Sequence, residues 1–168
     1  GPAARDVQVE NRTQVREVAE EYLRYQLLLP PDARFSGVFP TEQGAMVEFV
    51  PHYQGIPVYS GFIRVDLSAR GIEQVVQFWA QPVGYKGSQP KAVRPAAEAL
   101  LRLAGHLERT GEPTRTILDV RLGYYSGPSV TVPGSDGISS WETVPVWRIT
   151  LDNGMVYYIN AFNGELES

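Results

Sequence analysis

The sequence predicts an α+β protein of two tandem units packed together, each an amphipathic helix followed by an antiparallel sheet. Two observations lead to this prediction. Two segments carry apolar residues at helical spacing, and each is followed by short apolar segments separated by turn-forming residues. Because a helix of this length cannot bury its apolar stripe alone, each is expected to lie across its own sheet. We expect the units at 11–84 and 91–168, together forming one composite domain.

The start of the chain predicts no structure. Gly1-Pro2 without an initiator Met is typical of the remnant of a protease cleavage site, so residues 1–10 are predicted to be a scar and a disordered or linker start. We expect the natural chain to begin earlier, with a transmembrane anchor or a signal segment as the alternatives.

The first helix is predicted over residues 11–29. Asn11 suits the N-cap, with Gln14 placed to complete a capping box, and Pro30-Pro31 should end the helix. Its buried stripe should contain Val15, Val18, Ala19, Tyr22, Leu23 and Leu27. Strands are then predicted at 35–39, 45–50, 58–67 and 72–80, the last two joined in a hairpin by the turn at 68–71.

The second unit follows a linker rich in turn formers at 84–90. Its helix is predicted over 95–109, with Gly111 and Pro113 ending it and a buried stripe of Ala97, Leu100, Leu101, Ala104 and Leu107. Strands are predicted at 116–125, 144–151 and 155–161, the last two joined across Asn153-Gly154, with a short final strand. We match the halves by aligning Pro57–Val76 with Pro145–Ile159.

Composition excludes several classes of function. The net charge is −4 and the basic residues are scattered, so neither a nucleic-acid surface nor a polybasic membrane patch is expected. The absence of cysteine excludes disulfides, thiolate zinc sites and a cysteine nucleophile.

No catalytic constellation is predicted. His52 and His106 lie far apart on different element types, and the carboxylates show no acid/base spacing, so no catalytic, metal or cofactor-binding residue is assigned. The glycines form no phosphate-binding loop, and the serines of 126–140 lack the glycine-flanked turn of a hydrolase nucleophile.

Aromatic residues near the 126–140 loop are the candidate contact residues. Loops of this length are often functional, and Trp and Tyr are frequent contact residues in protein interfaces. Ordinary packing of a helix-covered sheet is the alternative explanation. The residues predicted to bind a partner are Tyr124, Tyr125, Trp141 and Tyr158.

The motifs of the second half resemble the YycH/YycI family, and YycI most closely. They are Leu122–Tyr125, Val144–Ile149 and Tyr157–Glu165, and the first half agrees at Gly55–Tyr59. The pattern also resembles the PepSY-like unit, a helix packed on an antiparallel sheet, so the resemblance implies a PepSY/cystatin-like fold. It supplies no catalytic residues.

The resemblance implies a regulator that acts by contact. Such proteins have an N-terminal transmembrane helix and an extracytoplasmic domain, and they regulate the WalK sensor histidine kinase, which governs cell-wall metabolism. The expected partners are therefore the kinase and a YycH-like protein in the same cell membrane, with no nucleic acid. Three alternatives stay open: a homodimer, a PepSY-type binding or peptidase-inhibitory module, and a small-molecule-binding cystatin-like domain or weak enzyme.

If partners bind near the aromatic loop, Trp141→Ala should weaken association without unfolding the domain. Affinity for the partner, measured beside a thermal melt, checks this. Unchanged affinity would place the interface elsewhere.

Overall fold

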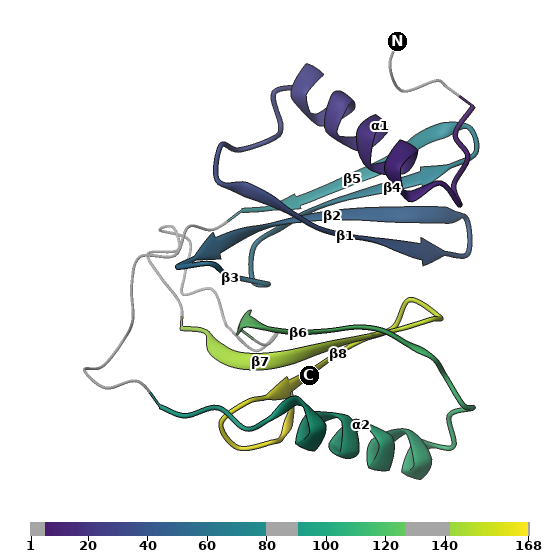
Figure 1. The fold of residues 1–168 in the computed structure, drawn as a ribbon. Helices are drawn as coiled ribbons and strands as arrows, with labels where there is room; N and C mark the ends of the chain where they lie inside the picture. Colours follow the sequence, from purple (N-terminus) through teal and green to yellow (C-terminus); the bar gives the residue numbers. More distant parts are fainter. Residues whose placement is uncertain (1–5, 80–90, 127–141, 168) are drawn as a thin grey trace, which may run out of the picture. The chain divides into compact units, whose positions relative to one another are not determined.

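The computed structural model describes residues 6–79, 91–126 and 142–167, and Figure 1 shows its elements. The first part contains α1 (Arg12–Tyr25), β1 (Ala33–Thr41), β2 (Gly44–Tyr53), β3 (Ile56–Pro57), β4 (Phe62–Ser68) and β5 (Gly71–Phe78). The second contains α2 (Ala96–Thr110), β6 (Ile117–Tyr125), β7 (Val144–Leu151), β8 (Val156–Asn160) and β9 (Leu166–Glu167).

The chain divides into two compact units, Gly1–Pro82 and Val83–Ser168, each with one helix and one antiparallel sheet. The strand order is β1-β2-β4-β5 in the first unit, where β3 pairs with β2, and β6-β7-β8-β9 in the second. In each unit the helix lies across one face of the sheet (Figure 1). The predicted α+β fold with two helix-plus-sheet units is confirmed.

The start of α1 follows the predicted N-cap with a different partner for Gln14. The Asn11 Oδ1 accepts a hydrogen bond from the Gln14 backbone N–H at 3.1 Å. The Gln14 side chain, however, accepts from the backbone N–H of Gln8 at 2.9 Å instead of that of Asn11. The capping box is therefore replaced by a bond that holds the preceding segment against the helix.

Residues 7–10, expected within an unstructured start, belong to the first unit. The Val7 backbone N–H donates to Ala69 O at 2.9 Å, and the Val7 side chain is 4% exposed within the core. Val9 packs against the same core. Contact with the apolar core and a backbone hydrogen bond to a residue distant in the sequence thus order residues 7–10. The composition of this segment alone predicts no structure for it.

The end of α1 lies earlier than predicted, at Tyr25 instead of Leu29. Leu27 has φ +56°, its N–H donates to Arg24 O, and the N–H of Leu28 donates to Leu23 O. This is a Schellman motif, in which a left-handed residue closes the helix before Pro30 is reached. Leu27 is 92% exposed, so its predicted place in the buried stripe is wrong.

The core of the first unit joins the helix to the central strands. The buried α1 residues Val15, Val18, Ala19 and Leu23 pack with the strand residues Val38, Ala45, Val47, Phe49, Ile63, Val65 and Leu67. The chain also turns closely at Gly44, where a Cβ would collide with the backbone O of Leu67, so only glycine fits.

The bounds of α2 agree with the prediction, but its buried side does not. The helix runs from Ala96 to Thr110 and ends at Gly111, which has φ +72°. The core contains Ala99 and Leu103, with Leu100 and Leu107 packed beside them, on the strand residues Ile149, Leu151 and Ile159. Ala97, Leu101 and Ala104 are exposed. Their predicted burial is wrong because α2 carries apolar residues on two sides, and periodicity alone does not show which side is buried.

The strands of the two units correspond to one another differently from the predicted alignment of Pro57–Val76 with Pro145–Ile159. Their shared strand order pairs β1 with β6, β2 with β7, β4 with β8 and β5 with β9. The Asn153-Gly154 turn therefore corresponds to the connection between β2 and β4, and not to the turn at Gly71. Each first strand also carries a glycine two residues before an aromatic, Gly37 with Phe39 and Gly123 with Tyr125.

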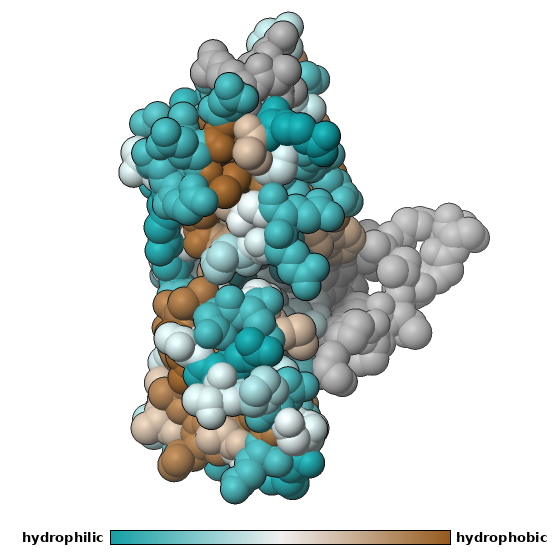
Figure 2. Space-filling model, turned by 90° about the vertical axis from the view of Figure 1, so that its right-hand side faces the viewer, coloured by the Kyte–Doolittle hydropathy of each residue, from teal (hydrophilic) through white to brown (hydrophobic). Residues whose placement is uncertain are grey.

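Apolar side chains also reach the surface of both units. On the side shown in Figure 2, brown hydrophobic areas alternate with teal hydrophilic ones. The exposed large hydrophobic residues of the second unit include Leu101, Ile117, Leu118 and Met155. Among the residues that the structure describes, no helix has both the length and the apolar character needed to cross a bilayer.

The substitution Leu27→Gly should stabilise the protein, because a left-handed leucine costs about 1–2 kcal/mol and an exposed side chain contributes little burial. After the added entropy of the unfolded chain, a gain of about 0.5–1 kcal/mol remains, measurable by urea denaturation. Gln26→Gly is the matched control, since Gln26 is exposed with φ −83° and should only lose stability. A loss for Leu27→Gly would contradict this account of the helix end.

Candidate functional site

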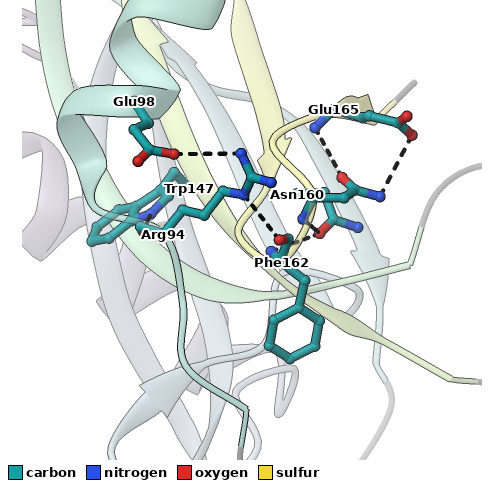
Figure 3. A network of polar contacts seen from close by, with 7 residues as sticks. Arg94, Glu98, Trp147, Asn160, Phe162 and Glu165 are labelled. Carbon is teal, nitrogen blue, oxygen red and sulfur yellow. Dashed lines mark hydrogen bonds and ion pairs between the residues drawn. The ribbon is translucent and has the colours of Figure 1, made fainter.

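The best-defined polar cluster lies at the turn between β8 and β9, around Asn160 (Figure 3). The Asn160 Oδ1 accepts from the backbone N–H groups of Phe162 at 2.8 Å and Asn163 at 3.1 Å, and its Nδ2 donates to Glu167 Oε1 at 2.8 Å. The Asn160 backbone N–H donates to Glu165 O at 2.7 Å. Because Asn160 is 7% exposed, its side chain fixes the turn from inside.

Arg94 connects this turn to the chain that enters α2. Its backbone N–H donates to Ala161 O at 2.7 Å, and its backbone O accepts from the Trp147 indole Nε1 at 2.8 Å. The Arg94 guanidinium donates from Nε to Phe162 O at 3.0 Å and lies 3.5 Å from Glu98 Oε2 (Figure 3). Three separate elements are therefore joined at one residue.

The chemistry of this cluster is structural. The side chains of Arg94 and Glu98 are 51% and 52% exposed, so solvent screens their ion pair and it contributes little stability. The partly buried bonds of Asn160 and the bond of the Trp147 indole instead satisfy backbone groups outside the strand pairing. The arrangement positions a helix on a sheet and offers no nucleophile next to a base.

The two histidines belong to different units. His52 lies on β2 in the first unit, while His106 lies on α2 in the second, edge-on to the Tyr157 ring at 5.9 Å between centroids. Within the described residues, no group of three His, Cys, Asp or Glu side chains could hold a metal ion. His106 therefore acts as a packing residue.

The predicted contact residues separate into two groups. The rings of Tyr125 on β6 and Tyr158 on β8 stack at 3.8 Å between centroids with 3° between their planes. Strand alternation directs Tyr124 to the opposite face, the face that carries Val120 of the helix-covered core. Trp141 lies outside the described residues. The structure thus brings together Tyr125 and Tyr158, both half-buried, as a rigid aromatic pair.

The first unit contains a second charged cluster, which the sequence did not predict. Glu48 on β2 is 1% exposed, and its Oε2 lies 3.0 Å from Arg64 Nε on β4. The Arg64 Cζ also lies 4.1 Å from the centroid of the Phe62 ring. A buried carboxylate requires such a partner, but only strand pairing of Glu48 with Arg64 reveals it.

Asp66 lies on the same strand as Arg64. Burial raises the pKa of the Asp66 carboxyl, and the positive charge of Arg64 opposes that shift. The pKa of Asp66 is higher in the folded than in the unfolded chain. The stability that this carboxyl contributes is therefore present at low pH and is lost as the pH rises through the folded pKa.

The fold and these clusters define a class of protein. It is a duplicated α+β domain in which the polar clusters of the described residues hold strands, turns and the start of a helix in place. Comparison with known families gives the particular one. The chain belongs to the YycI family, whose model, described as YycI protein, matches residues 7–162.

A solved structure shows the same fold. The chain is similar to the Bacillus megaterium YpeB C-terminal domain, with 11% identity and a TM-score of 0.53, over 98% of this chain and 65% of that one. The chain thus spans about two thirds of the length of that domain. No curated protein matches it in sequence.

Replacing Asn160 with alanine should lower the free energy of unfolding by about 2–4 kcal/mol, because two backbone N–H groups of a part-buried turn lose a buried acceptor. Urea denaturation measures the loss. Asn153→Ala is the matched control: Asn153 accepts one backbone bond, from Met155, in an exposed turn, so its loss should stay below about 1 kcal/mol. Equal losses would show that burial of Asn160 contributes nothing.

Proposed function

We propose that this chain is the extracytoplasmic domain of a membrane-anchored regulator that modulates a WalK-type sensor histidine kinase by protein–protein contact. The observation that carries the proposal is the family match over residues 7–162, which takes in elements of both units. The polar clusters around Asn160 and Glu48 support it, because their described bonds are used within the fold.

A regulator of this kind acts thermodynamically. If the domain binds one state of a kinase complex more tightly than another, binding shifts the population toward the preferred state. A coupling of about 1–3 kcal/mol is typical and changes the ratio of the states by about 5–150-fold. The domain needs no reactive centre for this, only a surface that distinguishes the two states, and we propose no catalytic activity for it.

The proposed setting is the cell membrane. A transmembrane helix ahead of this domain would hold it outside the cytoplasm, next to the kinase and a YycH-like protein anchored in the same bilayer. Anchoring converts association into an encounter at high effective concentration, so a modest contact surface suffices. The output would be control of cell-wall homeostasis.

The stacked pair Tyr125–Tyr158 is the proposed contact point. Stacked rings have lost much of their conformational freedom before binding, so docking against them costs little further entropy. Tyrosine is also enriched among the residues that contribute most to interface affinity. Tyr124 and Trp141 remain proposed contact residues on the strength of their place beside the same loop.

A second candidate is a PepSY-type binding or peptidase-inhibitory module. The fold likeness to the YpeB C-terminal domain favours it, because that likeness covers 98% of this chain and so includes the helix-plus-sheet units. Neighbouring genes distinguish the candidates: a histidine kinase and response regulator support the regulator, whereas a peptidase supports this module.

Co-purification from membranes tests the regulator. The full-length protein with its membrane segment should recover the kinase and the YycH-like protein. Replacing both Tyr125 and Tyr158 with alanine should reduce recovery about tenfold or more. Tyr25→Ala is the control, since Tyr25 is a 70% exposed tyrosine on α1 of the other unit. Recovery of neither partner by the unmodified protein would refute the regulator, and unchanged recovery by the double variant would move the contact point.

A further inference from the structure

Two asparagines of the second unit are each followed by glycine. Asn153-Gly154 lies in the turn between β7 and β8, and Asn163-Gly164 lies in the turn between β8 and β9. Asparagine is a thermolabile residue, because its side-chain amide can react with the backbone nitrogen of the next residue. Glycine has no side chain to obstruct that approach. The sequence therefore makes the two pairs equal candidates for spontaneous deamidation.

The reaction needs only water and proceeds through a cyclic imide. The backbone nitrogen of the glycine forms a bond to the Cγ of the asparagine, the bond from Cγ to Nδ2 breaks, and the proton of the glycine N–H leaves with the ammonia. Water then opens the ring at either carbonyl carbon. One opening gives aspartate, and the other gives isoaspartate, in which the main chain runs through Cβ. The glycine nitrogen and the asparagine Cγ must leave their folded positions and meet for the ring to close.

The turn at Asn163-Gly164 is closed from inside by Asn160 (Figure 3). The Gly164 N–H donates to Asn160 O at 2.8 Å, and the Asn163 N–H donates to Asn160 Oδ1 at 3.1 Å. The Asn163 side chain is held as well, since its Oδ1 accepts from the Glu165 N–H at 2.9 Å and its Nδ2 lies 3.5 Å from Glu165 Oε2. Because Asn160 is 7% exposed, opening this turn requires a buried side chain to lose its bonds.

The turn at Asn153-Gly154 forms the tip of the β7–β8 hairpin. The Gly154 N–H donates to Leu151 O at 3.0 Å, and the Asn153 Oδ1 accepts from the Met155 N–H at 3.1 Å. All four residues of the tip are exposed: Asp152, Asn153, Gly154 and Met155. Opening the tip breaks these two bonds and leaves the buried side chains of the hairpin in place.

We propose that Asn153 is a deamidation site, and that the bonds of Asn160 protect Asn163 from the same reaction. The exposed hairpin tip opens more often than the turn closed by a buried side chain, so the ring closes more often at the first pair than at the second. The co-reactant is water, and the products are aspartate and isoaspartate at position 153. The proposal requires neither the kinase nor a membrane, so it is independent of the proposed function.

The two products should affect the β7–β8 hairpin differently. Aspartate keeps the acceptor for the Met155 N–H and the same length of main chain. Isoaspartate adds one main-chain atom to the turn, which conflicts with the register that pairs Thr150 with Val156. The isoaspartate form, separated by ion-exchange chromatography, should therefore melt at a lower temperature than the unmodified chain, whereas Asn153→Asp should melt like it. Equal melting of all three forms would contradict this account of the turn.

Peptide mapping of the aged protein tests the site. The 168-residue chain is incubated at mildly alkaline pH, digested, and analysed by mass spectrometry and by labelling with an isoaspartyl methyltransferase. Deamidation at Asn153 should be about tenfold faster, or more, than at Asn163. The chain unfolded in guanidinium is the reference, and its two rates should be similar, because each asparagine precedes glycine. Equal rates in the folded chain, or an unchanged Asn153 long after the unfolded chain has reacted at both sites, would overturn the proposal.

The variant Asn160→Ala tests the protection. It removes the Oδ1 acceptor from the turn, so deamidation of Asn163 should become about tenfold faster. Asn153 is the internal control, because general destabilisation would accelerate both reactions, whereas loss of one turn should leave the rate at Asn153 unchanged. Circular dichroism checks that the variant is folded. An unchanged rate at Asn163, or equal acceleration at both sites, would show that Asn160 gives no specific protection.

Discussion

Burial of each amphipathic helix on its own sheet is the constraint on which the structure depends. Leu23 of α1 and Leu103 of α2 are almost completely buried, each in a separate apolar core formed with strands of the same unit. Full burial of one such side chain contributes about 1.5–3 kcal/mol. This burial outweighs local backbone strain, such as the left-handed conformation of Leu27 at the end of α1.

Polar side chains then determine how the elements meet. Asn160 shapes the turn between β8 and β9, and Arg94, through Trp147 and Ala161, sets where the chain enters α2. In the first unit the buried Glu48 is paired with Arg64 across two strands. The bonds of Asn160 and Glu48 satisfy buried side chains, and together with the Arg94 contacts they hold the scaffold in one arrangement.

The two units share one strand order but differ at their edges. The last strand has eight residues in the first unit and two in the second. Burial of the helix constrains the core residues in both units. An edge strand can change in length and sequence without disturbing that burial. The aromatic pair of Tyr125 and Tyr158 lies on the second unit, and the first unit ends in β5, which pairs with β4 alone among the described strands.

The sequence by itself determined the elements and the class of fold, because helical and strand periodicities, prolines and glycine turns are local properties. The bounds of α2 and the β7–β8 hairpin follow from them directly. Only the tertiary structure decided which side of α2 is buried, since both Leu101 and Leu103 satisfy the helical period. It also decided the pairing of Glu48 with Arg64, the stacking of Tyr125 on Tyr158 and the ordering of Val7, because each depends on contacts between residues distant in the sequence.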